Sequence, residues 1–162
     1  VPEKGPDTME NILISACLLG VCCRYDGESK PIMQTVALME HYHLVPVCPE
    51  QLGGLPTPRE PSERQGEAVV MKNGADVTAQ YRRGAEQALH LARLYGCKAA
   101  VLKERSPSCG SGNIYDGTFS GCLTPGDGVT AALLKENGIA VYGESEIGRL
   151  LEEHGQPMEA MF

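Results

Sequence analysis

Four short apolar runs, each ending in turn-forming residues, constrain the fold of this 162-residue chain more than any other feature. The runs are Ile12–Ala16, Leu44–Val47, Lys98–Leu102 and Ile139–Tyr142. Short runs that are apolar throughout are typical of parallel strands that are buried on both faces. Helical patterns lie between the runs, so strands and helices alternate along the chain. This alternation predicts an α/β fold, a three-layer sandwich with a mainly parallel sheet.

The apolar periodicity between these runs predicts helices at Pro31–Tyr42, Thr78–Tyr95, Val129–Glu136 and Glu144–Glu153. Pro31 suits a first helical position, Asp127 suits an N-cap, and Gly96 and Gly138 suit helix ends. Gly84 lies inside the longest helix, where glycine is less favourable than alanine by ~1 kcal/mol. We therefore expect another backbone segment to approach Gly84 closely.

Two short segments carry hairpin signals. Asn73-Gly74 lies between apolar residues, and Asp116-Gly117 lies within Ile114–Phe119. A third segment, Val47–Glu63, holds four prolines and two adjacent glycines. It is predicted to be a shaped loop with neither ordinary helix nor ordinary strand.

Length and composition predict a single domain over residues 11–162, after a flexible N-terminal extension of residues 1–10. No apolar run approaches the ~20 residues that span a bilayer, so we expect no membrane partner. The net charge is −7 and the 14 Lys and Arg residues are scattered, which argues against binding a nucleic-acid duplex. The first ten residues lack the pattern of a secretory signal, which predicts a cytoplasmic protein.

The seven cysteines point to metal binding or catalysis, because an odd number of thiols in a reducing compartment disfavours a disulfide framework. Cys17, Cys48 and Cys109 each follow a predicted strand. The carboxyl ends of parallel strands meet at the edge where α/β proteins bind ligands. Thiolates select copper(I), zinc or iron–sulfur clusters, and three without a fourth leave one coordination position open.

Polar residues beside these three cysteines extend the predicted site. Glu50 lies two residues after Cys48 across a proline, and a carboxylate there can carry protons or position water. Ser106 and Ser108 precede Cys109 in a turn that can aim donors at an anionic ligand. Arg24 and Tyr25 follow the first strand and are further candidates for binding a substrate.

A cysteine taken alone is more often a small buried residue than a ligand. Cys97 fits that interpretation best, whereas the sequence leaves the place of Cys122 open. The adjacent Cys22 and Cys23 are unsuited to one ligand shell; either is a spare thiol, a packing residue or a transient redox partner. The four histidines show no zinc-finger spacing and are expected at the surface or in packing.

Three long motifs resemble one known family. I-S-A-C-L-L-G-V-C-C-R-Y-D-G, C-P-E-Q-L-G-G-L-P-T-P-R and K-E-R-S-P-S-C-G together resemble the bacterial desulfurase domain family that includes thiouracil desulfurase and the YbbK-type proteins. The resemblance covers roughly residues 11–148 and keeps the motifs in order. It implies a Rossmann-like domain that binds a 4Fe-4S cluster through three cysteines, which match Cys17, Cys48 and Cys109.

The resemblance also implies a reaction. The fourth iron of the cluster is left for the substrate and takes sulfur from a thiolated pyrimidine, while water replaces the sulfur at carbon without net redox change. The assisting carboxylate and hydroxyl match Glu50 and Ser106. We therefore expect an iron–sulfur-dependent, hydrolytic desulfurase that acts on a small thiolated nucleobase or nucleoside, of thiouracil type. The alternatives are a non-catalytic iron–sulfur or zinc module that senses redox state, and a thiol-based sulfur carrier that uses Cys22 or Cys23.

Overall fold

The computed structural model describes residues 9–155, and its centre is a four-stranded parallel sheet with the order β2-β1-β5-β8. The strands of this sheet are β1 (Glu10–Ser15), β2 (Tyr42–Val47), β5 (Ala99–Leu102) and β8 (Ala140–Gly143). All four strands match apolar runs of the sequence to within a few residues. The predicted α/β fold class and the parallel sheet are confirmed.

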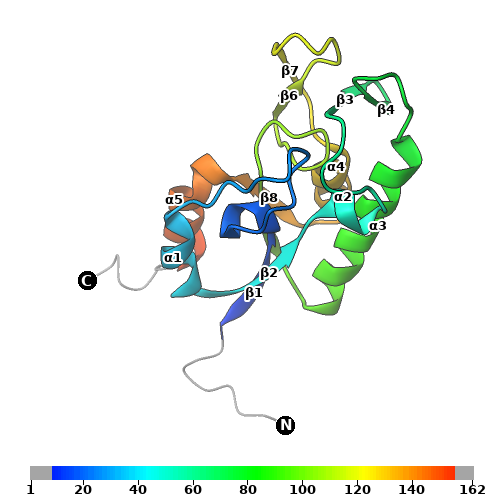
Figure 1. The fold of residues 1–162 in the computed structure, drawn as a ribbon. Coiled ribbons are helices and arrows are strands. Elements are labelled where there is room, and N and C mark those ends of the chain that lie inside the picture. The colour runs from blue at the N-terminus through cyan, green and yellow to red at the C-terminus, as the bar shows by residue number, and fades with distance from the viewer. Residues whose placement is uncertain (1–8, 156–162) are drawn as a thin grey trace.

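Helices cover both faces of the sheet (Figure 1), which completes the predicted three layers. On β1, Ile12 and Ile14 pack into the core cluster that includes Leu38 and Leu150, whereas Leu13 packs on the opposite face with Ala88 and other residues. This alternation follows from the two-residue period of a strand. The covering helices are α1 (Gln34–Met39) and α5 (Ile147–Leu150) on one face, and α3 (Thr78–Leu94) and α4 (Val129–Glu136) on the other.

Helix α1 is shorter than the predicted Pro31–Tyr42. The backbone N–H groups of Lys30 and Ile32 donate to the carbonyls of Cys17 and Leu18, so this stretch stays extended beside the first loop. The helix begins only at Gln34, and the Ile32 carbonyl before it accepts a hydrogen bond from the Thr35 hydroxyl at 2.8 Å. The predicted N1 position of Pro31 is wrong because tertiary contacts use the neighbouring amides.

The N-cap predicted at Asp127 is also wrong. Gly128 takes that position, and the first amides of α4 donate to backbone carbonyls of Pro107 and Ser108. The Asp127 carboxylate instead accepts from the Gly112 N–H at 2.8 Å and from Lys135 at 3.0 Å. The loop that carries Cys109 therefore caps α4.

The predicted helix ends at Gly96 and Gly138 are confirmed, since both glycines have positive φ and directly follow the C-cap residues. The segment Glu144–Glu153 is helical throughout, with three geometries: a 3-10 turn at Glu144–Glu146, then α5, then a π turn at Leu151–Gly155. Within residues 9–155, no helix is long and apolar enough to cross a membrane.

Two antiparallel hairpins decorate the sheet, as predicted, but their turns differ in detail. Strands β3 (Ser62–Gln65) and β4 (Ala68–Met71) form the first hairpin, which turns at Gly66. Asn73-Gly74 forms the next tight turn, in which the Gly74 N–H donates to the Met71 carbonyl and the Met71 N–H donates to the Ala75 carbonyl; an isolated bridge joins Val70 and Asp76 beside it. Strands β6 (Asn113–Tyr115) and β7 (Leu123–Pro125) form the second hairpin, and Asp116-Gly117 opens its long loop.

The segment Val47–Glu63 holds more regular structure than predicted. Pro49 occupies the first position of a one-turn helix, α2 (Pro49–Leu52), where proline is compatible with a helix, and β3 begins at Ser62. The close approach predicted at Gly84 is confirmed: a Cβ there would lie 1.9 Å from the Pro49 carbonyl oxygen. Glycine lets α2 lie directly against α3.

The predicted extension of residues 1–10 falls mostly outside the described residues, and Glu10 already belongs to β1. The predicted extent of the single domain, residues 11–162, stays a prediction at its C-terminal end, because residues 156–162 are likewise outside the described part.

Candidate active site

A pocket of about 780 Å³ opens at the carboxyl ends of β1, β2 and β5. The chain leaves β1 toward β2 on one side and returns to β5 on the other, so this edge is the switch point at which α/β sheets bind ligands. The pocket is lined by four cysteines, Cys17, Cys23, Cys48 and Cys109. Three of them are the predicted ligands.

Two of the predicted ligands lie in tight turns directly after their strands. Cys17 is in the 3-10 turn Ala16–Leu19, which follows β1, and it is buried. Cys48 is the N-cap residue of α2, directly after β2. In each case the thiol is fixed by the first residues beyond a strand, which places both sulfurs at the same edge of the sheet.

The third predicted ligand, Cys109, is held by a turn that the preceding serine organises. The Ser106 oxygen accepts hydrogen bonds from the N–H groups of Ser108 and Cys109, both at 3.0 Å. The Ser15 hydroxyl at the end of β1 reaches the Cys109 sulfur at 3.5 Å. Burial raises the pKa of Cys109 to about 12, so without a metal this group is a neutral thiol at physiological pH.

Cys23 is a fourth thiol beside the predicted ligands. It is buried, it contacts the Cys17 thiol, and this contact raises the pKa of Cys23 to about 11. Contact with Cys23, together with burial and the Glu50 charge, raises the pKa of Cys48 far above its usual range. The Cys48 sulfur also lies 3.6 Å from the Cys23 carbonyl oxygen.

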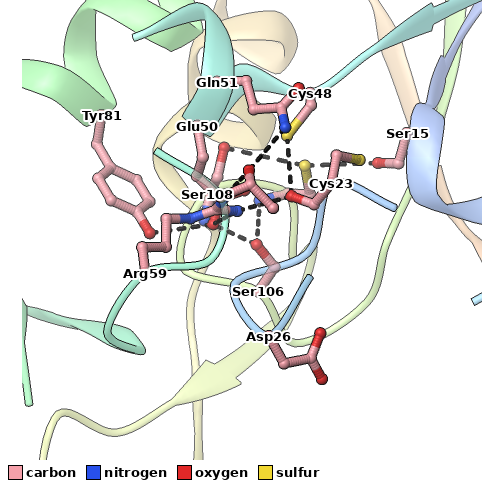
Figure 2. Close-up of polar contacts among 12 residues, drawn as sticks. Ser15, Cys23, Asp26, Cys48, Glu50, Gln51, Arg59, Tyr81, Ser106 and Ser108 are labelled. Carbon is pink, nitrogen blue, oxygen red and sulfur yellow. Dashed lines mark hydrogen bonds and ion pairs between the residues drawn. The ribbon is translucent and has the colours of Figure 1, made fainter. Parts of the chain in front are cut away.

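The predicted carboxylate lies among these thiols. Glu50 is in the single turn of α2 and lines the pocket. Its Oε2 accepts a hydrogen bond from the Tyr81 hydroxyl at 3.1 Å and lies 3.6 Å from Arg59 Nη2, as Figure 2 shows. The predicted Glu50 and Ser106 thus share one pocket with the three predicted cysteine ligands.

This donor set fits a cluster better than a single ion. Within residues 9–155, no three His, Cys, Asp or Glu side chains converge closely enough to hold one metal ion. A cluster binds each thiolate at a different iron, so its ligands stand further apart around the edge of the cluster. A cluster with thiolate ligands is also anionic, and the basic side chains that line the pocket outnumber its four carboxylates: Arg24, Lys30, Arg59, Lys72, Lys103 and Arg105 against Glu50, Glu63, Glu104 and Glu144.

Comparison with known proteins identifies the family. The family model described as 2-thiouracil desulfurase matches residues 12–146, which includes every residue of the pocket described above. This chain belongs to the 2-thiouracil desulfurase family.

Two relatives cover nearly the whole chain. The uncharacterized protein YbbK of Bacillus subtilis (strain 168) is 45% identical over 150 residues, which are 86% of this chain and 99% of YbbK. A solved structure of the [4Fe-4S]-dependent thiouracil desulfidase TudS is 51% identical, with a TM-score of 0.85, and the match covers 89% of this chain and 97% of that one. The resemblance predicted from the three sequence motifs is confirmed.

Of the three residues predicted to bind substrate, two line this desulfurase-family pocket and one does not. Arg24 and Tyr25 line the pocket, with the Arg24 guanidinium 5.8 Å from the centre of the Tyr25 ring and 3.7 Å from Asp26. Ser108 does not line it: the side chain is fully buried, and its hydroxyl pairs with Thr130 at 2.9 Å. The prediction for Ser108 is corrected, because its turn directs the hydroxyl into the core under α4.

Sequence reasoning missed three polar partners of the pocket: Cys23, Tyr81 and Ser15. The sequence does not distinguish Cys23 from its neighbour Cys22. In the structure Cys22 is exposed, whereas Cys23 is buried beside the predicted ligands. Tyr81 lies on the apolar face of its predicted helix, a position that predicts only packing, and its buried ring accounts for that pattern. Ser15 ends an apolar strand, and its value as a sulfur donor depends on a contact with a residue 94 positions away.

A second carboxylate, which is buried, shapes the wall of the pocket. Glu63 at the start of β3 accepts hydrogen bonds through Oε1 from the N–H groups of Gly117 and Phe119, at 2.9 and 3.1 Å. Phe119 has φ of 59°, an unusual backbone conformation for a bulky residue, and lines the pocket with Tyr115. Glu63 therefore fixes the loop that brings aromatic side chains to the site.

Proposed function

We propose that this chain is an enzyme that replaces the sulfur of a small thiolated pyrimidine with oxygen from water, with the help of a 4Fe-4S cluster. The observation that carries the proposal is the gathering of Cys17, Cys48 and Cys109 beside Glu50 in one pocket. The identity to the [4Fe-4S]-dependent thiouracil desulfidase supports it. We propose those three cysteines as the ligands.

In this reaction a C=S bond and water give a C=O bond and hydrogen sulfide, with no net oxidation or reduction. When bound, the cluster supplies a soft iron that attracts the thiocarbonyl sulfur. Glu50 would accept a proton from the attacking water. The Ser106 oxygen already accepts two N–H bonds, so its O–H can turn to the substrate. Arg24 and Tyr25 are proposed to contact the substrate, a thiouracil-like nucleobase or its nucleoside.

The thiol-based carrier is less well supported at Cys23, one of its two candidate residues. A nucleophilic thiol needs a lowered pKa, whereas contact with Cys17 raises the pKa of Cys23. All seven cysteines are free, which fits a reducing compartment and supports the proposed cytoplasmic location.

The experiment is anaerobic reconstitution with iron and sulfide, followed by iron and sulfide analysis of the wild type and of Cys→Ser variants. We expect Cys17→Ser, Cys48→Ser and Cys109→Ser each to lose the stable cluster, while Cys23→Ser, the matched control, keeps it. A Cys23→Ser variant that loses the cluster, together with one of the other three that retains it, would contradict the proposed ligand set.

A second variant separates the enzyme from a binding module. Glu50→Gln should retain the cluster and lose most of its thiouracil turnover. If Glu50→Gln retains both the cluster and full activity, the role of Glu50 is wrong.

A further inference from the structure

Glu50 is held through only one of its two carboxylate oxygens. Oε2 accepts a hydrogen bond from the Tyr81 hydroxyl at 3.1 Å and forms an ion pair with the Arg59 guanidinium at 3.6 Å (Figure 2). In the described part of the chain, no hydrogen bond reaches Oε1. A carboxylate fixed at one oxygen has its second oxygen directed as well, because the group is planar.

Tyr81 is a rigid support for this contact. It lies in the first turns of α3 and is 2% exposed, and its ring packs with Leu55, Val69 and Val77. Burial, together with the Glu50 charge, raises the pKa of Tyr81, so its phenol remains a hydrogen-bond donor across the physiological range. The hydroxyl therefore donates to Glu50 whenever that carboxylate is ionised.

Arg59 is equally constrained. Its side chain is 2% exposed. Its guanidinium donates to the Cys23 carbonyl at 2.9 Å, to the Pro56 carbonyl at 3.1 Å and to the Thr57 hydroxyl at 2.9 Å. A guanidinium fixed in this way cannot follow a moving carboxylate. Arg59 thus connects the position of Glu50 to the backbone at Cys23, beside the thiols.

The backbone adds a third constraint. Helix α2, which carries Glu50, touches α3, which carries Tyr81, through two glycines: a Cβ on Gly53 would lie 2.0 Å from the Gln80 carbonyl oxygen, and one on Gly84 would lie 1.9 Å from that of Pro49. The two helices therefore meet backbone to backbone. This fixes the distance that the hydrogen bond between Tyr81 and Glu50 must span.

We propose that Tyr81 and Arg59 are positioning residues that hold Glu50 by Oε2 and so present Oε1 as the oxygen that accepts the proton of the attacking water. The inference rests on the proposed desulfurase function. Small misplacements of a catalytic group lower rates by up to ~100-fold, so the loss of either contact should act on the chemical step.

Tyr81→Phe is the first test, with Tyr95→Phe as its matched control. Tyr95 follows α3, and its side chain is half exposed. In the reconstituted enzyme, Tyr81→Phe should lower kcat for thiouracil by ~10-fold to ~100-fold, the effect of one hydrogen bond to a charged group, with KM nearly unchanged. Tyr95→Phe should leave both constants unchanged. Iron content should match the wild type in both variants.

A double-mutant cycle makes the assignment specific. In a Glu50→Gln background, Tyr81→Phe should lower kcat by less than ~3-fold, because the proton-accepting carboxylate that Tyr81 positions is already absent. Arg59→Lys, which keeps the charge and removes the planar fork, should show the same coupling to Glu50. Full independent effects of Tyr81→Phe and Glu50→Gln would overturn the inference, as would a Tyr81→Phe enzyme as active as Tyr95→Phe.

The contact can also be tested without turnover. In the cluster-free protein, which has no tryptophan, Glu50→Gln should change the ultraviolet absorption of a tyrosine, and this change should vanish in the Tyr81→Phe background. Persistence of the change in that background would overturn the inference even if the enzyme is active. A wild type that takes up the cluster and turns over no thiolated pyrimidine would overturn the proposed function itself, and with it this inference.

Discussion

At the scale of single residues, Ser15 links the sheet to the sulfur of Cys109. Its buried oxygen accepts the Lys103 N–H at 2.9 Å, and its hydroxyl reaches the Cys109 sulfur at 3.5 Å. A donor to a cluster sulfur stabilises the reduced, more negative cluster and so raises its reduction potential. Ser15 therefore serves both the fold and the proposed cofactor.

Ser15→Ala should lower the reduction potential of the reconstituted protein. It should also decrease the free energy of unfolding by ~1–3 kcal/mol, because the Lys103 amide loses its partner. A redox titration followed by electron paramagnetic resonance, and a denaturant titration, measure the two effects. Ser120→Ala, at an exposed position, is the control. A Ser15→Ala protein with the potential of the wild type would show that the contact with sulfur has no influence.

The thiols differ in predicted reactivity. Cys22 and Cys122 are exposed, whereas Cys97 is buried and its burial raises the pKa to about 11. At pH 8 about one Cys97 thiol in a thousand is then ionised, and only the thiolate reacts. Alkylation of the cluster-free protein, followed by peptide mass spectrometry, should label Cys22 and Cys122 first.

The labelling rate of Cys97 should rise steadily with pH up to about 11, since its ionised fraction increases over that range. This increase should be measured below the pH at which the protein unfolds. Equal labelling rates for Cys97 and Cys22 at pH 8 would contradict the burial of Cys97.

Sequence patterns predicted the position of a residue correctly where that position depends on its neighbours along the chain. Cys17 and Cys48 follow apolar runs directly, so their place at the sheet edge came from the pattern alone. Tyr81 could not be found in this way, because its partner Glu50 lies 31 residues away and only the packing of α2 on α3 brings them together. Ser108 was misjudged because the direction of a side chain in a turn depends on the helix that the turn caps.

At the scale of elements, the contact between α2 and α3 fixes the site. Alanine is a better helix former than glycine by ~1 kcal/mol, so Gly84→Ala would stabilise an isolated helix. Here its Cβ would lie 1.9 Å from the Pro49 carbonyl oxygen. We expect Gly84→Ala to decrease the free energy of unfolding by ~1–3 kcal/mol, as overpacking does, and to reduce turnover by moving Glu50.

Gly148→Ala is the matched control, because a Cβ at this glycine of α5 meets no atom within 4 Å. It should be neutral or slightly stabilising. Urea titrations of both variants measure the difference. A Gly84→Ala protein as stable as Gly148→Ala would contradict the close packing of α2 on α3.

At the starts of two helices, tertiary contacts override the pattern in the sequence. Helix α1 begins at Gln34 and not at the predicted Pro31, because the amides of Lys30 and Ile32 donate to carbonyls of the 3-10 turn Ala16–Leu19. The expected cap at Asp127 failed because Gly128 takes that position, and a Cβ on Gly128 would lie 2.5 Å from the Ser108 carbonyl oxygen, where no side chain fits. Both deviations arise from the loops that carry Cys17 and Cys109, so the site itself shifts the ends of the helices.

At the scale of the whole molecule, the pocket joins three loops that the sheet alone does not hold together. A cluster bound to Cys17, Cys48 and Cys109 would cross-link these loops only in the folded state. Binding at ~1,000 times the dissociation constant stabilises a fold by ~4 kcal/mol, which for a chain of this size raises the melting temperature by roughly 8–16 °C.

Anaerobic thermal unfolding of the reconstituted and cluster-free protein measures this stabilisation. The increase should disappear in Cys109→Ser and persist in Cys23→Ser. An equal melting temperature with and without the cluster would contradict a cross-link among the three loops.

The most direct test of the proposed function is the stoichiometry of turnover. Anaerobically reconstituted wild type is incubated with 2-thiouracil and no added electron donor or acceptor, and uracil and sulfide are both quantified. We predict one uracil and one sulfide for each thiouracil consumed, over many turnovers, and none with the cluster-free protein. A protein that contains four irons and four sulfides per chain and forms no uracil would contradict the proposed function.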